Sequence, residues 1–522
     1  MLETIIQNGL IGLYVTILFL IAGYGLHRFV LIYLYVKHKK KVHEVQQPFA
    51  ELPFVTVQLP MYNEDLVARR VIDATCRIDY PPEKFEIQVL DDSTDHSAEI
   101  AQEAVAKWAA RGINIVYVHR KDRTGYKAGA LAEGMKTAKG EFLAIFDADF
   151  IPPVDILHNV VNHFADPKIG MVQVRWDHLN RDLSLLTRGQ AIFLDGHFVI
   201  EHTARNRSGR FMHFNGTAGV WRRDTINDAG GWSHDTLTED LDLSYRAQLK
   251  GWQFIYLPQF CAPAELPPEI IAFKQQAHRW TKGSFQTAIK LLPRILRSPV
   301  LPWRIKTEAF FHLTNTIVYP LMVLLTISMY PAFIFSEGPL KNHPLASWLF
   351  ALTLFVVATC SASAFFIFAQ RELFGSRVGW RTAKYLPFIM ALGVGISLNN
   401  ARAVIEAIFT DRKKGRNEFV RTPKYGVTGK TRHQLSKSTS PLSFQKLALP
   451  ILEVAFGCYM SCFIFIALYY QIWRGSVPFL CIFAGGYLYV GCSSVWTLWN
   501  QHHDRLAVEI EPEVEETPVI SA

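Results

Sequence analysis

Apolar and polar residues separate into long blocks along this chain of 522 residues. Five uncharged stretches each reach the length of about 20 residues that a helix needs to cross the hydrocarbon of a bilayer. They are residues 4–26, 313–335, 346–369, 454–473 and 475–500. The pattern therefore predicts an N-terminal transmembrane anchor over 1–36 and two pairs of transmembrane helices, over 309–370 and 447–500.

Lysine and arginine residues indicate which connections face the cytoplasm, because cytoplasmic loops are enriched in both. Four lysines lie between residues 37 and 41, just after the first stretch. The connections 371–385 and 410–446 carry four and ten basic residues. We therefore expect both connections, and the polar region that starts at residue 37, to lie on the cytoplasmic side.

A sixth apolar stretch, 386–408, lies between the two connections expected inside, so it is not expected to cross. Its uncharged part is short and is followed by Arg402 and Glu406. This favours an amphipathic helix in the membrane interface. The alternative is a true span, with one of the other five stretches not crossing. Residues 183–200 and 284–296 are further candidates for interfacial helices.

Residues 50–300 alternate short β-branched runs with helical patterns. Strands are predicted at 54–59, 85–90, 113–119 and 142–146, and helices at 64–78, 97–110 and 127–138. This alternation is typical of a mostly parallel sheet covered on both faces, in the α/β class. Ligands of such sheets bind beyond the carboxyl ends of the strands.

Acidic residues gather at three of these strand ends, where Glu64, Asp91-Asp92 and Asp147-x-Asp149 follow the first, second and fourth strands. Carboxylates together with substrate phosphates are the usual ligands of Mg²⁺. Taken singly, each motif has a structural alternative as a helix cap or a polar turn. The same holds for Thr238-Glu239-Asp240, a capping pattern, and for Gln276-x-x-Arg279-Trp280, a helix packing face.

Composition narrows the class of protein. Only 19% of residues are charged and the net charge is +8, with Lys and Arg flanking apolar blocks. This excludes a simple cytosolic enzyme and argues against nucleic-acid binding. The seven cysteines are scattered and no Cys/His pattern has zinc spacing, so neither a disulfide framework nor a structural metal is expected. Residues 501–522 are predicted to form an acidic, disordered tail.

Four of these motifs occur together in an order that resembles the membrane-embedded family 2 glycosyltransferases, the cellulose-synthase-like group. They are Asp92, Asp147-x-Asp149, Thr238-Glu239-Asp240 and Gln276-x-x-Arg279-Trp280. The resemblance covers about residues 50–430. Segments 58–64, 125–131, 214–221 and 419–424 are similar to plant-type mannan and glucan synthases and their bacterial relatives. The resemblance implies a GT-A type, Rossmann-like catalytic domain over 50–300 and a gating loop after the interfacial helix, within 386–446.

The resemblance also implies roles for individual residues. Asp240 is the expected base, with Glu239 beside it, and Asp147 and Asp149 are expected to hold Mg²⁺ or Mn²⁺ on the donor diphosphate. The expected donor-binding residues are Tyr62, Glu64, Asp91, Asp92, Lys127, Asp147 and Asp149. The acceptor and diphosphate residues are Asn215, Gly216, Thr217, Gln276, Arg279 and Trp280, and the gating-loop residues are Phe419, Arg421, Thr422 and Lys424.

The implied reaction is inverting transfer of a hexose from UDP-glucose or GDP-mannose to a growing β-linked polysaccharide that is threaded through the membrane. A second hypothesis keeps the chemistry but transfers one glucose to a lipid, diacylglycerol or ceramide. A membrane scaffold without activity is disfavoured because all acidic motifs are intact. We expect a bacterial inner-membrane protein with several spans and a cytoplasmic catalytic domain.

Overall fold

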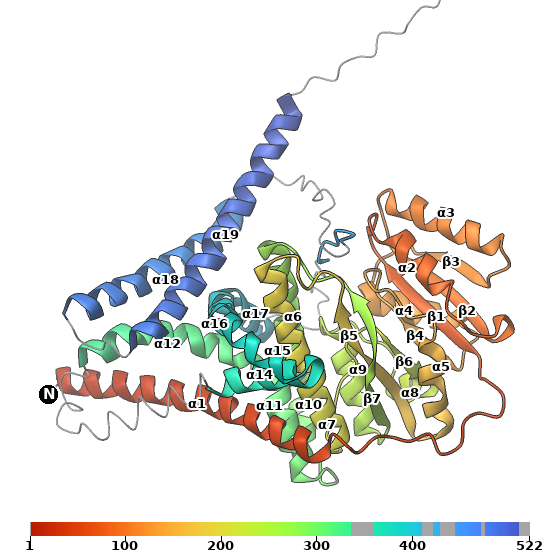
Figure 1. Ribbon diagram of the computed structural model, residues 1–522, viewed down its shortest axis with the longest axis horizontal. Helices are drawn as coiled ribbons and strands as arrows, with labels where there is room; N and C mark the ends of the chain where they lie inside the picture. The colour runs from red at the N-terminus through yellow and green to blue at the C-terminus, as the bar shows by residue number, and fades with distance from the viewer. Residues whose placement is uncertain (1, 336–359, 410–420, 428–443, 471–475, 511–522) are drawn as a thin grey trace, which may run out of the picture.

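The computed structural model describes residues 2–335, 360–409, 421–427, 444–470 and 476–510. Figure 1 shows a sheet domain at one end of the molecule and a bundle of long helices at the other. Between them, α10 (Ile270–Arg297) and the run of α6 (Leu185–Asp195), η3 (Gly196–His202) and α7 (Thr203–Arg207) pack against helices of the bundle.

A seven-stranded sheet forms the centre of the first part, in the order β3-β2-β1-β4-β6-β5-β7. The four predicted strands are confirmed and are mutually parallel where they pair. β6 is antiparallel to both neighbours, so the sheet is mixed. The strands are β1 (Val55–Met61), β2 (Phe85–Asp91), β3 (Ile115–His119), β4 (Phe142–Ile145), β5 (Ile169–His178), β6 (Gly219–Arg222) and β7 (Gln253–Ala264).

Helices cover both faces of this sheet, and alternate residues of one strand supply the two cores. In β4, Phe142 and Ala144 join the core beneath α2, α3 and α5, while Leu143 and Ile145 join the core beneath α4 and α9. All four are fully buried, which explains the continuous apolar run of this strand. These helices are α2 (Ala68–Thr75), α3 (Ser97–Ala109), α4 (Tyr126–Thr137), α5 (Ile156–Val161) and α9 (Glu239–Leu249), with η1 (Pro82–Lys84), η2 (Asn162–Ala165) and α8 (Arg223–Asp228) between them.

Five helical segments of the described chain are long and apolar enough to cross a membrane: Gly12–His38, Trp303–Met329, Ser376–Phe409, Gln445–Tyr469 and Val477–His503. They belong to α1 (Leu2–His38), α11 (Trp303–Thr314), η4 (Asn315–Ile317), α12 (Val318–Phe335), α15 (Ser376–Arg381), η6 (Thr382–Tyr385), α16 (Leu386–Gly395), α17 (Ser397–Phe409), α18 (Phe444–Tyr469) and α19 (Val477–Ile510). The chain is therefore a multi-pass membrane protein.

The structure describes only part of one predicted stretch of the bundle, and another stretch forms two helices. Of the predicted span 346–369, residues up to 359 lie outside the described chain, and α14 (Ser361–Phe374) begins after them. The stretch 386–408 forms two helices, α16 and α17, packed against α19, α10 and α12. Because this stretch also meets the length and composition of a span, its interfacial placement stays a prediction.

The predicted disordered tail begins too early. α19 continues to Ile510, so residues 501–510 are helical, and 511–522 lie outside the described chain. The predicted interfacial stretch 284–296 is the second half of α10. The other one, 183–200, enters α6 and η3, whose residues pack on α14 and α16.

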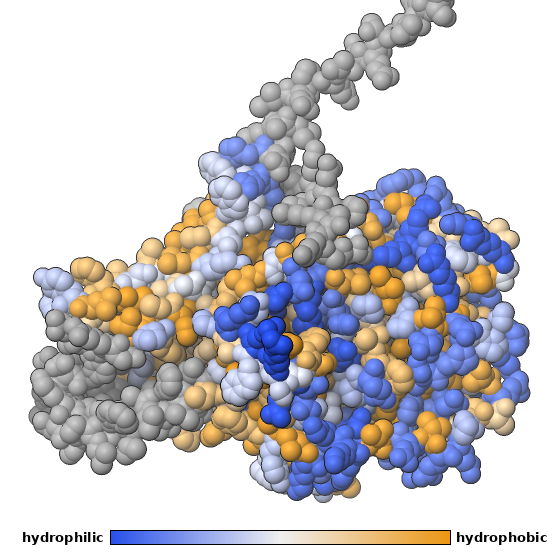
Figure 2. Space-filling model, in the orientation of Figure 1, coloured by the Kyte–Doolittle hydropathy of each residue, from blue (hydrophilic) through white to orange (hydrophobic). Residues whose placement is uncertain are grey.

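Surface polarity separates the two parts of the molecule. Figure 2 shows apolar residues over α18 and the adjoining part of α19, and mostly polar residues over the sheet domain. Exposed apolar side chains on α18 include Ile451, Leu452, Phe465 and Leu468. Apolar side chains on the outside of a helical bundle are what a surrounding lipid phase requires.

The crossing of α16 and α19 gives the first testable prediction. A Cβ on Gly486 would overlap the carbonyl oxygen of Ala391, whereas one on Gly485 meets no atom within 4 Å. Small residues permit this close approach of two helices. Gly486→Ala should therefore cost about 1–3 kcal/mol of stability, seen as a lower Tm of the purified protein. Gly485→Ala is the control, and equal Tm values for the two variants would contradict the close crossing.

Candidate active site

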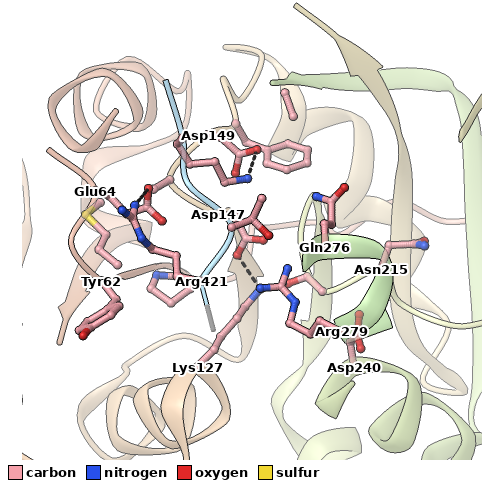
Figure 3. A pocket seen from close by; sticks show the side chains of 18 of the residues that line it. Tyr62, Glu64, Lys127, Asp147, Asp149, Asn215, Asp240, Gln276, Arg279 and Arg421 are labelled. Carbon is pink, nitrogen blue, oxygen red and sulfur yellow. Dashed lines mark hydrogen bonds and ion pairs between the residues drawn. The ribbon is translucent and has the colours of Figure 1, made fainter. Parts of the chain in front are cut away.

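A cleft lies beyond the carboxyl ends of the strands, at the edge where the acidic motifs were expected to meet. It brings together residues from the β1, β2 and β4 ends, from α4, α9 and α10, and from segment 421–427. The predicted site residues that line it are Tyr62, Glu64, Asp92, Lys127, Asp147, Asp149, Asn215, Gly216, Glu239, Asp240, Gln276, Arg279, Trp280, Arg421, Thr422 and Lys424. All four sequence motifs therefore face one common space (Figure 3).

The backbone around the cleft is strained. Asn63, Tyr126 and Ala218 are the non-glycine residues of the described chain with positive φ, at 54°, 50° and 56°. Each adjoins a residue that lines the cleft or belongs to a predicted site motif. Such conformations cost roughly 1–3 kcal/mol each and persist where the surroundings hold them, commonly at functional sites.

Asp147 is tied to its neighbours on both sides. Lys127 Nζ donates to Asp147 Oδ1 at 2.5 Å and to the carbonyl oxygen of Gly216 at 2.9 Å (Figure 3). The Asp147 backbone N–H donates to Thr217 Oγ1 at 2.9 Å. Although burial opposes it, Asp147 and Glu239 raise the pKa of Lys127, so this ammonium stays charged. Lys127 thus joins α4, the β4 end and the 215–217 loop.

Segment 421–427 lies in the cleft and is held there by ion pairs. Arg421 donates to Glu64 Oε2 at 2.9 Å and Lys424 Nζ to Asp149 Oδ2 at 2.6 Å. Tyr425 adds a backbone N–H to Glu265 Oε2 at 3.3 Å. Burial raises the pKa of Glu64 to about 8, although Arg421 and Lys424 oppose the shift. Phe419, the first predicted gating residue, lies outside the described chain.

Asp240 stands in the first turn of α9, facing the 215–217 loop. The Leu241 N–H donates to its Oδ1 at 2.8 Å. Burial, with the charge of Glu239 next to it, raises the pKa of Asp240 to about 7. A Cβ on Gly216, whose φ is +82°, would lie 3.1 Å from Asp240 Oδ2, so glycine keeps the space in front of this carboxyl open.

The α10 residues form the opposite wall. Gln276 lies about one turn before the adjacent pair Arg279 and Trp280, and all three reach the cleft, with Trp280 36% exposed. The strongest charge interaction of Arg279 is with Glu239, and weaker ones follow with Asp147 and Asp240. A guanidinium among several carboxylates is placed to pair with phosphate oxygens when an anionic ligand enters.

Two predicted site residues lie behind the lining. Asp91 is fully buried and accepts hydrogen bonds from Tyr117 Oη at 2.7 Å and the Ser93 N–H at 2.9 Å. Thr217 is also fully buried and supports Asp147. Both side chains shape the cleft from beneath its surface rather than from within it.

Two arginines at the β3–α4 connection, Arg120 and Arg123, belong to the site but were not predicted from the sequence. Arg120 donates to both oxygens of Asp92, from Nε to Oδ1 at 2.7 Å and from Nη2 to Oδ2 at 2.5 Å, and it also donates to the backbone carbonyls of Thr124 and Tyr126. Arg123 lines the cleft and stacks on Tyr62, its guanidinium carbon 3.3 Å from the ring centroid. Their positions in the sequence could have indicated this role, because both arginines follow the carboxyl end of β3.

Asp147 and Asp149 fit a divalent cation. Both carboxylates line the cleft, and in each a lysine ammonium stands against the oxygens that a metal would use. Hard oxygen donors of this kind suit Mg²⁺ or Mn²⁺ completed by ligand phosphates. Lys424 would have to leave Asp149 for such an ion to bind.

The raised pKa of Asp240 predicts a pH effect on stability. Because the folded protein holds this proton up to about pH 7 and the unfolded chain releases it near the ordinary aspartate pKa of 3.8, stability falls as pH rises through that window. Asp240→Asn should therefore lose less Tm between pH 5 and pH 8 than the unmodified protein. Asp224→Asn, at an exposed position, is the control. Parallel Tm curves for all three proteins would refute the raised pKa.

Comparisons with known proteins agree with this geometry. A family model described as "Glycosyltransferase like family 2" matches residues 53–283. A solved structure, the mannosyltransferase PcManGT from Pyrobaculum calidifontis in complex with GDP-Man and Mn²⁺, superposes with a TM-score of 0.50 at 23% identity, covering 70% of this chain and 99% of that one. This likeness shows the fold, a GT-A-like mixed sheet, and confirms the predicted fold class.

Among curated proteins, the chain is 44% identical over 283 residues to "Probable glucomannan 4-beta-mannosyltransferase 4" of Oryza sativa subsp. japonica, covering 53% of this chain and 52% of that protein. It is 34% identical over 426 residues to "Glucomannan 4-beta-mannosyltransferase 7" of Arabidopsis thaliana, covering 80% of this chain and 72% of that protein. The match thus spans about half the length of the first and nearly three quarters of the second. With both the motif-bearing domain and much of the helical part matched, the chain belongs to the family 2 glycosyltransferases, in the cellulose-synthase-like group.

Proposed function

We propose that this protein transfers mannosyl units from GDP-mannose to the end of a 4-β-linked mannan or glucomannan. The names of the rice and Arabidopsis relatives support mannose as the sugar and a polysaccharide as the acceptor. UDP-glucose remains the second donor to test. The observation that carries the proposal is the convergence of Asp92, Asp149, Asp240 and Arg279 on one cleft.

Asp240 is the proposed base. A carboxyl with a pKa near the working pH combines a useful deprotonated fraction with a driving force for taking the proton of an acceptor hydroxyl. Attack by that hydroxyl on the face of the sugar opposite to the diphosphate would invert the configuration at the anomeric carbon. Gly216, by leaving the space before Asp240 open, admits the acceptor end.

The diphosphate would lie between Arg279, Lys127 and the Asp147–Asp149 pair. Mg²⁺ or Mn²⁺ held by these two aspartates would neutralise the negative charge of the departing diphosphate. Lys127 stays charged and would serve the same group from α4. Tyr62, stacked with Arg123 at the β1 end of the cleft, is the proposed platform for the nucleotide base.

Segment 421–427 would act as the gate. Arg421 and Lys424 lie on the cleft carboxylates Glu64 and Asp149, so a bound metal and diphosphate would compete for the same partners. On donor binding, we expect both cations to turn from these carboxylates to phosphate oxygens. Such an exchange would leave Asp149 to the metal, and Glu64, whose pKa burial raises to about 8, can take up a proton when Arg421 leaves, so that no buried charge stays unpaired.

The proposal also includes export of the polymer through the membrane helices. The Gln276–Trp280 wall belongs to α10, which packs against α17 and α19 of the bundle. A chain that grows past Trp280 would thus emerge next to the membrane helices, so elongation and translocation could be coupled. The positions of the basic connections support a cleft on the cytoplasmic side, and a bacterial inner membrane stays the proposed location.

A product assay tests the proposal. Purified protein in lipid nanodiscs, given GDP-[¹⁴C]mannose and Mn²⁺, should produce label that is insoluble in both ethanol and chloroform–methanol and is released by an endo-β-1,4-mannanase. EDTA should stop incorporation. Label extracted into chloroform–methanol would favour the lipid acceptor, incorporation from UDP-glucose alone would favour a glucan, and no transfer from either donor would overturn the proposal.

A matched pair of variants tests the base. Asp240→Asn should lower the rate of transfer by about 10²–10⁴-fold, the usual contribution of a general base, while donor affinity changes little. Asp224→Asn is the control. In the unmodified protein the rate should rise with pH to half of its maximum near pH 7, following the pKa of Asp240. Normal turnover by Asp240→Asn would remove this residue from the role.

A further inference from the structure

A cluster of three histidines lies behind the cleft, outside the site described above. His197 and His202 come from η3, and His213 comes from the segment that leads into the 215–217 loop. One ring nitrogen of each lies within 4.8 Å of those of the other two. No structural metal was expected because no Cys/His pattern in the sequence has zinc spacing, and only the fold brings these three histidines together.

The π-helical turn explains why His197 and His202 face each other. Residues five apart in an α-helix point about 140° away from one another. In η3, Gly196–His202, the wider π turn brings positions i and i+5 to the same side, and the two ring centroids are 4.4 Å apart. π-helical turns are rare and occur frequently at functional sites.

The histidine nitrogens are short of partners. His202 is fully buried, and neither of its ring nitrogens makes a well-formed hydrogen bond in the described chain; the Asn215 amide acts on this ring and opposes the lowering of its pKa by burial. The Nδ1 of His213 is likewise buried and unpartnered among the described residues. A buried polar atom without a partner costs about 1–3 kcal/mol, and within this cluster the His202 ring carries two such atoms and the His213 ring one.

Asn215 sits among the three rings. Its Nδ2 lies 3.1 Å from both His197 Nε2 and His213 Nε2, while its Oδ1 is buried without a partner in the described chain. Figure 3 shows the Asn215 side chain pointing away from Asp147 and Arg279. Turning the amide by 180° would direct Oδ1 to the position that Nδ2 now occupies, facing the imidazoles.

The surroundings also suit neutral imidazole ligands. His197 Nδ1 lies 3.0 Å from Glu201 Oε2, so Nδ1–H can donate to this carboxylate and leave Nε2 with its lone pair toward the cluster. Burial, together with neighbouring His197, lowers the pKa of His202 and of His213 well below the usual value. In protein metal sites, a ligating histidine commonly donates its other ring N–H to a carboxylate in this way.

We propose that His197, His202 and His213 bind a divalent transition metal, represented by Zn²⁺, with Asn215 Oδ1 as an oxygen ligand. Three imidazoles and one oxygen make a four-coordinate set that zinc accepts. Nitrogens around tetrahedral zinc lie about 3.3 Å apart, so the rings would close by roughly 1 Å or a little more. The ion would tie η3 to the 215–217 loop and hold Gly216 in front of Asp240.

This site differs in chemistry from the Asp147–Asp149 pair. Nitrogen-rich donors select zinc and related transition metals, whereas paired carboxylates select Mg²⁺ or Mn²⁺. The two sites can therefore be separated by metal type, and the inference does not depend on which sugar the protein transfers.

The test uses the full-length protein in nanodiscs, stripped with a chelator, reloaded with Zn²⁺ in excess Mg²⁺, and freed of unbound metal. Elemental analysis should give about one zinc per chain, and X-ray absorption at the zinc edge should show imidazole nitrogens at about 2.0–2.1 Å. Zinc loading should also raise the Tm. His202→Gln should lose the zinc, and His158→Gln, at an exposed histidine, should keep it.

Three results would overturn the inference: no zinc retained by the reloaded protein, an absorption spectrum with oxygen ligands only, or normal zinc content in His202→Gln. Since the first two are measured on the unmodified protein, they hold even when the variant folds poorly. None of these measurements uses sugar transfer, so a failed metal site and a failed product assay remain distinguishable.

Discussion

Crowding of carboxylates in one cleft is the constraint on which the rest of the site depends. Like charges this close cannot all remain ionised without cations beside them. Asp147 and Asp149 are matched by Lys127 and Lys424, at 2.5 Å and 2.6 Å. Asp240 meets the same constraint differently, since burial and Glu239 raise its pKa to about 7. The cleft thus separates carboxylates that hold cations from a carboxyl that can exchange a proton.

The mixed sheet is what makes this separation possible. An all-parallel order would send β6 away from the β4 end, but the antiparallel pairing of β4 with β6 brings the connection before β6 back to the same edge. Thr217 then accepts from the Asp147 N–H at 2.9 Å, and Gly216 accepts from Lys127 at 2.9 Å. The reversal of β6 therefore brings Asp147 next to the 215–217 loop, which borders the space in front of Asp240.

Much of this arrangement could be predicted from the sequence, for identifiable reasons. β4 is a continuous apolar run, and β1 and β2 are buried strands rich in apolar residues, so the polar residues that follow these three strands had to meet at one edge. The reversed strand could not be predicted, because pairing direction depends on partners distant in the chain. The histidine cluster could not be predicted either. A π turn changes which residues share a face of the helix, and the spacing rules for α-helices do not describe that change. The family resemblance assigned Asp91 to the donor together with Asp92, but its carboxyl is fully buried behind the cleft, where it accepts from Tyr117.

Buried ion pairs determine which parts of the molecule can move. Lys274, at the start of α10, donates to Glu453 of α18 at 2.7 Å, and Arg205 of α7 donates to Glu308 of α11 at 2.9 Å. Breaking a buried pair by separating its partners costs about 3–5 kcal/mol, so α10 and its Gln276–Trp280 wall are fixed to the helical bundle. Segment 421–427 makes its ion pairs at the cleft instead, where an entering diphosphate can replace the carboxylates. Under the proposed function, opening and closing of the site would therefore come from this segment, while the Gln276–Trp280 wall stays with the membrane helices.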